Sequence, residues 1–414
     1  MSSKTIVVLG AGAGGLIASN ALRGLLSHEH KVILVERDPI HSFPPSFLWL
    51  MTGDRRAEDI SIDVTRLVRR GIEVVLSEAR RIDTDKRRVE TDSCTLEYDY
   101  LIVALGAELA PETIPGLTDD TPTFFTFEGA KKLHQTLSSF HGGKIALAVG
   151  GLPYKCPGSP HEGVMLMADF FRKRGQLGSV NIHLFTPEPQ PMPTAGPMLG
   201  DALKQMLESK GIGFHPLHKL VSVDASAREL HFQGKEPIGY DLLVAIAPHR
   251  APQVARTSGL LNEAGWIPVD RRTLRTKHEG VYAIGDIAAV SIPGRWKAEV
   301  PLMLPKAGVF AHTEAEVVAH RIADEINGKT PSSELGGIGY CALEAGAGRA
   351  GFAFGEFFAE PSPRLTMRET GRVWHWGKVL FEQWWLSPFG VKREFLRILL
   401  ELGSKTLRIP AERI

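Results

Sequence analysis

The chain has 414 residues, 43% hydrophobic and 23% charged, which predicts a globular protein of two or three domains and excludes disordered, collagen-like and coiled-coil classes. Its 48 basic and 47 acidic residues nearly balance, which argues against nucleic acid as a partner. No run of 18 apolar residues predicts a membrane-spanning helix, and no cleavable leader precedes the first predicted strand, so we expect a protein made without a signal peptide.

The first segment predicts a dinucleotide-binding unit. Residues 5–9 form an apolar run typical of a buried strand, residues 10–15 read GAGAGG, and residues 16–26 have helical character. In such a unit, Gly10 permits a tight turn, Gly12 lets the backbone approach a pyrophosphate, and Gly15 lets the helix pack closely on the strand. The free N–H groups at the start of the helix would then point at phosphate.

The next strand supplies a ribose-binding group. The predicted strand 31–35 begins at Lys31, is apolar from Val32 to Val35 and leads into Glu36, which Arg37 follows. A carboxylate about 20 residues beyond the glycines can accept hydrogen bonds from both hydroxyls of an adenosine ribose. Strand, loop, helix, strand and acid together predict binding of an adenine dinucleotide.

Two later segments narrow the class. Residues 98–107 predict a buried strand that ends in a glycine turn, and residues 280–287 predict another, carrying Gly285 and Asp286. Together the three segments resemble the pyridine nucleotide–disulfide oxidoreductase superfamily of flavoproteins. As an alternative, Asp286 caps the following helix. The resemblance implies an α/β fold of two Rossmann-like domains, as in glutathione reductase, and FAD bound by Gly10, Gly12, Gly14, Gly15, Glu36, Arg37, Ala104, Gly106, Gly285, Asp286 and Lys306.

The middle of the chain departs from a nicotinamide site. Residues 144–151 predict a strand and glycine turn where a second phosphate-binding loop would stand, but residues 152–160 read LPYKCPGSP. Three prolines remove N–H donors and fix φ, so the loop disfavours NAD(P)H. In its place stands Cys156 beside Lys155, a cation that predicts a stabilised thiolate.

A second cysteine follows 185 positions later, at Cys341. Free cysteine is often a small buried hydrophobe, the interpretation we accept for Cys94. Residues 153–156 and 339–341, however, resemble the cysteine segments of sulfide:quinone oxidoreductases and of flavocytochrome c sulfide dehydrogenase flavoproteins, within a resemblance that spans residues 5–402. Many of these proteins carry a third, upstream cysteine that this chain lacks.

The resemblance implies a redox pair at the flavin, with Cys341 nearest to it and Cys156 as its partner. Sulfide would be oxidised to zero-valent sulfur or polysulfide, and two electrons would pass through FAD to a membrane quinone. Glu162 is a candidate for proton handling; His161 is another, although a plain loop position describes it equally well. We predict no metal site.

Lys306 lies in a Pro-Lys-Ala-Gly turn ahead of a helix predicted over residues 309–326. The turn resembles the family turn that places a lysine and a helix start beside the isoalloxazine, where both would stabilise negative charge. We therefore place Lys306 among the catalytic as well as the cofactor-binding residues; the alternative is a solvated lysine.

The last part of the chain predicts an interfacial helix. Residues 381–390 are rich in aromatic side chains, and residues 391–402 combine apolar residues at helical spacing with three basic ones. This pattern suits a bilayer surface, and it equally describes a core or dimer helix. With the resemblance, we expect a peripheral protein of the cytoplasmic membrane surface; a homo-oligomer is compatible with the sequence.

The expected organisation is an FAD domain from residues 1–110 and 270–330, a degenerate second Rossmann-like domain from 111–269, and a tail from 331–414. Three other functions stay open: a type II NADH:quinone oxidoreductase, a sulfide dehydrogenase flavoprotein that passes electrons to a cytochrome, and a non-catalytic flavin-binding module. Rapid reduction of the flavin by NADH would indicate the first, an export signal and a haem partner the second, and reduction by neither sulfide nor NADH the third.

Overall fold

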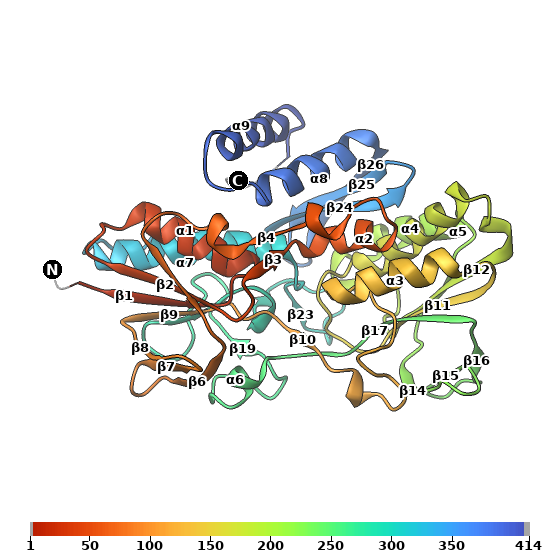
Figure 1. Cartoon of the computed structure of the whole chain (residues 1–414), viewed down its shortest axis with the longest axis horizontal. Coiled ribbons are helices and arrows are strands. Elements are labelled where there is room, and N and C mark those ends of the chain that lie inside the picture. The colour runs from red at the N-terminus through yellow and green to blue at the C-terminus, as the bar shows by residue number, and fades with distance from the viewer. Residues whose placement is uncertain (1–2, 410–414) are drawn as a thin grey trace.

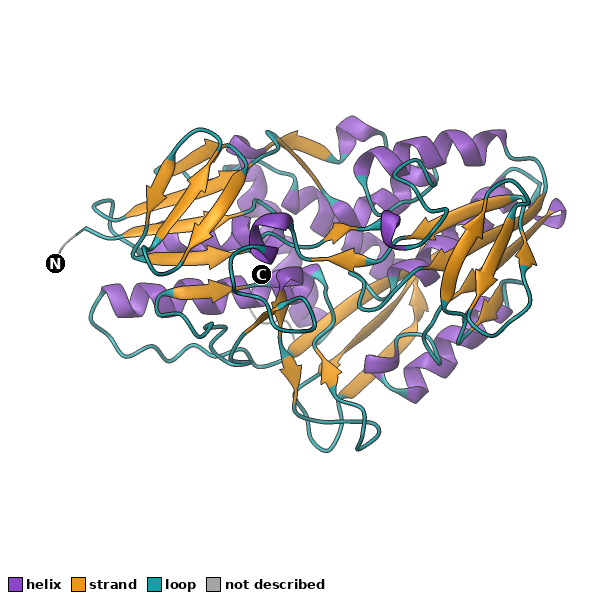
Figure 2. Cartoon of the chain, turned by 90° about the horizontal axis from the view of Figure 1, so that it is seen from below, coloured by secondary structure: helices purple, strands orange, loops and turns teal. Residues whose placement is uncertain are grey.

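The computed structural model describes residues 3–409. Two parallel sheets lie toward opposite ends of the molecule, and the C-terminal segment forms a third layer above them (Figure 1). Figure 2 shows from below that each end also carries a small three-stranded antiparallel sheet. The mixed α/β fold with parallel sheets that the sequence predicts is confirmed.

The first parallel sheet has the strand order β20-β9-β1-β2-β5. Helices α1 and α7 pack side by side against it, and the small sheet β6-β7-β8 extends from it. Apolar strands such as Ile6–Leu9 are fully buried because helices and loops cover the sheet. The elements are β1 Thr5–Leu9, α1 Ala13–Leu25, β2 Lys31–Glu36, β5 Ile72–Leu76, β6 Ala79–Asp83, β7 Arg88–Thr91, β8 Thr95–Glu97, β9 Tyr100–Val103, β20 Val281–Ala283 and α7 Gly308–Ile326.

The second parallel sheet has the order β13-β12-β11-β17 and repeats the strand, loop and helix opening of the first. The strand β20 belongs to the first sheet although it follows the whole of the second in sequence. The elements are α3 Phe127–Ser139, β11 Gly143–Val149, α4 Ser159–Lys173, β12 Val180–Phe185, α5 Pro197–Glu208, β13 Gly213–His215, β14 Leu220–Asp224, β15 Glu229–Phe232, β16 Ile238–Gly239 and β17 Leu242–Ile246.

The C-terminal layer is an antiparallel sheet, β24-β25-β26, followed by two helices. Strand β24 packs on α4 and so joins the layer to the second sheet, while Trp384, Trp385, Leu396 and Leu400 join the core of the first. The last helix is longer than the predicted 391–402. The elements are β24 Ile338–Gly346, β25 Arg349–Glu356, β26 Arg364–Gly371, α8 Arg372–Trp385 and α9 Val391–Thr406.

Short elements connect these layers. The strand predicted over residues 98–107 is regular only in β9, and its continuation forms β10 after the glycine turn. Within residues 3–409, every helix is too short or too polar to traverse a bilayer. The short elements are β3 Ile40–Ser42, η1 Pro44–Ser46, α2 Phe47–Met51, η2 Ala57–Asp59, β4 Ser61–Asp63, η3 Val64–Leu67, β10 Glu108–Leu109, η4 Pro111–Thr113, η5 Leu177–Ser179, η6 Pro193–Ala195, β18 His249–Arg250, α6 Gln253–Arg256, β19 Ile267–Pro268, η7 Gly285–Ile287, β21 Ala288–Ala289, β22 Ser291–Ile292 and β23 Leu302–Met303.

Candidate active site

The first glycine loop has the geometry of a phosphate cradle. Gly10 adopts a φ of +95°, which other residues rarely do, and a Cβ on Gly15 would lie 1.7 Å from the Gly10 carbonyl oxygen. A Cβ on Gly12 would instead meet no atom within 4 Å. The helix α1 begins directly after Gly12, with no acidic residue in its first turn and no side-chain cap. Its free N–H groups and positive end therefore fit a pyrophosphate.

Glu36 stands at the end of β2, beside this loop. One carboxylate oxygen accepts the Ala11 N–H at 2.6 Å, and the other accepts the N–H groups of Arg37 and Asp38 at 2.8 and 3.0 Å. These bonds fix the carboxylate while leaving lone pairs for ribose hydroxyls. The mostly exposed Arg37, next to Glu36, lines an open hollow of about 630 Å³ with Glu78 and other residues.

Other predicted cofactor residues lie at the carboxyl ends of β9 and β20. Ala104 packs beneath the loop, since the Gly10 Cβ position is 2.6 Å from its carbonyl oxygen. The Cβ positions of Gly14 and Gly106 differ: the first contacts Ile284 at 3.1 Å, whereas the second meets no atom within 4 Å. The structure thus brings the strand ends together around the loop, and these residues fit FAD.

Gly285 and Asp286 begin the turn after β20. Asp286 lies within η7, whose N-cap position is Ile284, so Asp286 does not occupy the capping position of the alternative. Burial raises the pKa of its carboxyl, and Lys155 and Lys306 oppose that rise. Two cations from separate loops therefore face one acid at this end of the first sheet.

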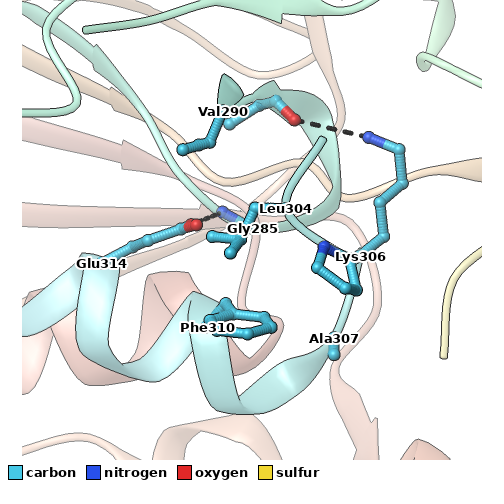
Figure 3. Close-up of a pocket in the computed structure, with 9 residues that line it drawn as sticks. Gly285, Val290, Leu304, Lys306, Ala307, Phe310 and Glu314 are labelled. Carbon is cyan, nitrogen blue, oxygen red and sulfur yellow. Dashed lines mark hydrogen bonds between the residues drawn. The ribbon is translucent and has the colours of Figure 1, made fainter. Parts of the chain in front are cut away.

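Lys306 and Glu314 line a small pocket with Gly285 (Figure 3). The Lys306 ammonium donates to the carbonyl oxygens of Asp286 and Ala288 and lies 3.5 Å from the ring centre of Trp266, so it is not a freely solvated lysine. Burial lowers its pKa to about 8, against the opposing charges of Asp286 and Glu314.

Glu314, on α7, is a site residue that sequence reasoning missed. Its carboxylate accepts the Gly285 N–H (Figure 3), and burial raises its pKa to about 7. An isolated Glu in a helical sequence carries no signal that distinguishes it from the many exposed ones.

The cysteine loop replaces the glycine cradle in the second sheet. It runs from the end of β11 to the start of α4 and holds Cys156 in the left-handed region, at φ +54°. The Cys156 N–H donates to the Lys306 carbonyl oxygen at 2.6 Å, and its own carbonyl accepts the Ser159 N–H. The loop is therefore attached to the Lys306 turn of the first sheet.

Cys341 reaches the same place from β24. Its Sγ lies 3.8 Å from the position of a Cβ on Gly158, two residues beyond Cys156. Both cysteines are half-buried thiols without a disulfide, whereas Cys94 is exposed and lies beside Thr91. The two predicted redox cysteines thus converge beside the strand ends that form the cofactor site.

The electrostatics of the pair correct one prediction. Burial, with a smaller contribution from the Glu162 charge, raises the pKa of Cys156 to about 12 and that of Cys341 well above its ordinary value. The principal opposing cation is Lys378 of α8. The prediction that Lys155 stabilises a thiolate is wrong, because desolvation and Glu162 outweigh the nearby cations.

Glu162 lies in the first turn of α4 and is 2% exposed. One of its oxygens accepts the Lys378 ammonium at 2.7 Å and the Glu344 N–H at 2.9 Å. The Glu344 carboxylate in turn lies 3.0 Å from Nδ1 of His375. Lys378, Glu344 and His375 escaped sequence reasoning, because their contacts join α4, β24 and α8, which are far apart along the chain.

His161 is 1% exposed, and neither ring nitrogen has a hydrogen-bond partner among the described residues. Burial lowers its pKa to about 4. The position is therefore buried rather than a surface loop, and a neutral imidazole at ordinary pH is a poor proton donor.

The helix α8 closes the site over the first glycine loop. His41 lies 3.1 Å from the Ala11 carbonyl oxygen through Nδ1, and its Nε2 accepts the Trp385 indole N–H at 2.9 Å. Glu382 of the same helix is buried and pairs with Arg55 and Ser46. These contacts bring the C-terminal aromatic residues against the segment that follows the ribose acid.

Residues 4–307 match the family described as pyridine nucleotide-disulphide oxidoreductase, and the chain belongs to that family. With the family fold and the cradle above, it is an FAD-dependent oxidoreductase. Of the residues described above, the glycine loop and α1 would hold the FAD pyrophosphate, Glu36 would bind its ribose, and the Gly285 and Lys306 segments would flank the remainder of the cofactor.

Among curated proteins, the chain is similar to the mitochondrial sulfide:quinone oxidoreductase of Mus musculus, with 25% identity over 96% of this chain and 90% of that protein. It is 26% identical to the sulfide-quinone reductase of Aquifex aeolicus, over 93% of this chain and 90% of that protein. A solved structure of the Aquifex aeolicus enzyme superposes with a TM-score of 0.83 at 23% identity, covering 99% and 95%. A type II NADH:quinone oxidoreductase of Staphylococcus haemolyticus is 23% identical to this chain, over 79% of this chain and 83% of that protein.

Proposed function

We propose that the chain is a sulfide:quinone oxidoreductase in which Cys156 and Cys341 form the sulfur-reactive pair. One observation carries the proposal. Cys156 and Cys341 lie 185 positions apart, with three strands of the second sheet and α7 between them, yet Cys341 reaches Gly158 of the cysteine loop, and that loop is bonded to the Lys306 turn of the FAD site. The similarity to curated sulfide:quinone oxidoreductases over nearly the whole chain supports the same substrates.

The chemistry of the pair follows from its two sulfurs. Hydrosulfide attacks a Cys156–Cys341 disulfide, the S–S bond breaks, and a cysteine persulfide and a cysteine thiolate result. Bound FAD supplies the acceptor for the two electrons that sulfide loses, and quinone takes them in turn. By the family pattern Cys341 lies nearest the flavin, and Cys156 is its partner.

The chain's own groups handle charge and protons around this step. Burial keeps both resting thiols protonated, so a base is needed when sulfur–hydrogen bonds break. Glu162 supplies a carboxylate next to both sulfurs. Lys306 and the start of α7 place positive charge beside the Gly285 turn, where reduction adds negative charge to the cofactor.

The second sheet is poorly suited to NADH. The loop after β11 has prolines at 153, 157 and 160, and α4 begins with Pro160 in its first turn. Proline has no N–H to donate to a phosphate. This loop therefore supports sulfide rather than NADH as the electron donor, which separates the proposal from the type II NADH:quinone oxidoreductases with the same fold.

The outer side of α9 suits the surface of a quinone-bearing membrane. Leu396 and Leu400 pack inward, while Val391, Phe395 and Leu402 are 89%, 58% and 56% exposed. Trp376 on α8 is also largely exposed, and both helices lie on the same side of the molecule (Figure 1). Exposed apolar side chains with flanking lysine and arginine favour peripheral attachment to lipid. The predicted alternative, a core helix, describes only the inner side of α9.

Anaerobic rapid mixing of the FAD-loaded protein with sulfide or NADH tests the proposal. Sulfide should bleach the flavin absorbance within a turnover, NADH should bleach it far more slowly, and a soluble quinone should restore it. Rapid bleaching by NADH alone would indicate a type II NADH:quinone oxidoreductase. Bleaching by neither donor would indicate a non-catalytic flavin-binding module.

A further inference from the structure

Four titratable side chains from three elements lie together behind the cysteine pair. Glu162 and Glu344 are 2% and 1% exposed, so both carboxylates are buried. The Lys378 ammonium lies 2.7 Å from Oε1 of Glu162 and 3.5 Å from the Ala342 carbonyl oxygen, next to Cys341. His375 lies 3.0 Å from Glu344.

The two oxygens of Glu162 have different surroundings. Oε1 accepts both hydrogen bonds, from Lys378 and from the Glu344 N–H, and Oε2 accepts none among the described residues. The position of a Cβ on Gly158 lies 3.8 Å from Oε2 and also 3.8 Å from Cys341 Sγ. Oε2 therefore lies on the sulfur side of the carboxylate, and Oε1 lies on the side of α8.

Lys378 donates a hydrogen bond to the buried Glu162, and the charge of the buried Glu344 also acts on its ammonium. An ionised carboxylate that loses its partner in such a place is strongly disfavoured, so the state of Glu162 depends on Lys378. His375 and Lys378 lie three residues apart on one face of α8, and His375 pairs with Glu344. Because His375 is the ion-pair partner of Glu344, Lys378 remains the partner of Glu162. The charged or titratable groups that face Glu162 are Lys378 from α8, Cys341 and Glu344 from β24, and Cys156 from its loop.

Building on the proposed sulfide chemistry, we propose that Lys378 is a positioning residue that keeps Glu162 ionised and holds its Oε2 toward the sulfurs, where Glu162 accepts the persulfide proton. In this step the S–H bond of the cysteine persulfide breaks and an O–H bond forms on Glu162. A persulfide anion and a neutral carboxylic acid result, and no electron moves. Glu344 and His375 support the step by fixing Lys378.

The test compares Lys378→Gln, Lys378→Arg and wild type, each as the full-length FAD-loaded protein. In Lys378→Gln the ascending limb of the pH profile for sulfide-dependent flavin reduction should move up by about 1 to 3 pH units, the range produced by losing an adjacent opposite charge. Lys378→Arg should restore most of the shift, and His375→Gln should produce a smaller one.

The matched control is Arg172→Gln, which removes an ion pair to the buried Asp169 of α4, the helix that also carries Glu162. It should lower the melting temperature and leave the pH midpoint unchanged. A Lys378→Gln profile that overlaps wild type, or an equal shift in Arg172→Gln, would overturn the inference.

A second readout needs no turnover. The infrared difference spectrum of Lys378→Gln minus wild type at neutral pH should show one additional carbonyl band of a buried protonated carboxylic acid, which adding Glu162→Gln removes. Buried acids with a raised pKa that both proteins share, such as Glu314, cancel in the difference. Absence of the additional band would also overturn the inference. If wild type were inert to sulfide, the proposed function would fail while this spectrum still tested the ion pair.

Discussion

The two parallel sheets open with the same strand, loop and helix, but the two loops carry different residues in front of their helices. After β1, Gly12 leaves open space in front of α1. After β11, Cys156 in a left-handed conformation and three nearby prolines occupy the corresponding place in front of α4. The comparison teaches that the sheet fixes where a loop lies, while the residues of the loop decide whether it holds a phosphate or a sulfur.

The largest expected effect comes from removing a sulfur of the second loop. Replacing Cys156 or Cys341 by alanine should lower the rate of sulfide-dependent flavin reduction by on the order of 10³-fold or more, as loss of a nucleophile does. Anaerobic rapid mixing measures this rate. The exposed Cys94→Ala is the control and should behave as wild type; full activity in either of the other variants would refute the pair.

Small additions to the two loops should separate their roles. Gly12→Ala adds a methyl group where the protein leaves space, so the fold should persist while FAD affinity falls by about tenfold or more, about 1.4 kcal/mol. Gly158→Ala meets Leu343 at 2.4 Å beside Cys341, so FAD should stay bound while sulfide reactivity falls. Flavin fluorescence titrations and rapid mixing check both.

The companion Gly15→Ala sharpens this comparison. Its methyl group would lie 1.7 Å from backbone oxygen, so it should destabilise the fold by about 3 kcal/mol or more in urea unfolding. Equal FAD affinity in Gly12→Ala and wild type would argue against a pyrophosphate at the first loop.

The next effect concerns thiol reactivity. Because the Glu162 charge contributes to the raised pKa of Cys156 and Cys341, Glu162→Gln should lower both values. The thiolate fraction at pH 8 to 9 then rises, about tenfold for each unit of pKa. Alkylation by iodoacetamide, followed by peptide mass spectrometry, should be faster in Glu162→Gln. An unchanged or slower rate at both cysteines would show that Glu162 does not act on them.

The smallest effect is on stability, through a histidine beside each loop. Burial lowers the pKa of both His41 and His161 to about 4, below the unfolded value of about 6.5. The unfolded chain therefore binds more protons between these values, so stability is full above pH 6.5 and falls as the pH drops toward 4. Each histidine should cost about 2 kcal/mol between pH 7 and 5.

Urea unfolding at the two pH values checks this, with His161→Leu as the informative variant. Its ring nitrogens lack partners in the described part of the chain, so leucine should reduce the pH dependence with little loss at pH 7. His41→Leu should also cost stability at pH 7, since His41 bonds to Ala11 and Trp385. Identical pH dependence in His161→Leu and wild type would contradict the assignment.

The sequence predicts the first glycine loop and its sheet better than it predicts the cysteine site. The first loop, Glu36 and the start of α7 lie in local patterns with a period or a spacing, so their elements and places are predictable. The pairing of Cys156 with Cys341 rests on resemblance, because no local rule brings β24 to α4. The ion pair of Glu162 with Lys378 spans 216 positions and has no pattern at all.

The burial of a side chain also cannot be predicted from its neighbours in the sequence, because it depends on the packing of distant segments. Lys155 stands beside Cys156 in the sequence and suggests a thiolate, yet the packing of β24 and α8 desolvates the sulfur and raises its pKa. The same holds for α9, whose pattern describes a membrane face and a core face together, and whose inner residues pack into the core of the first sheet.

Peptide mass spectrometry of the protein quenched after one anaerobic turnover with sulfide can detect the proposed bridge and its opening. Oxidised protein should have Cys156 and Cys341 joined and Cys94 free, and sulfide should open this bridge and leave one extra sulfur on a member of the pair. Two cysteines that stay unlinked under oxidation and gain no sulfur would contradict it.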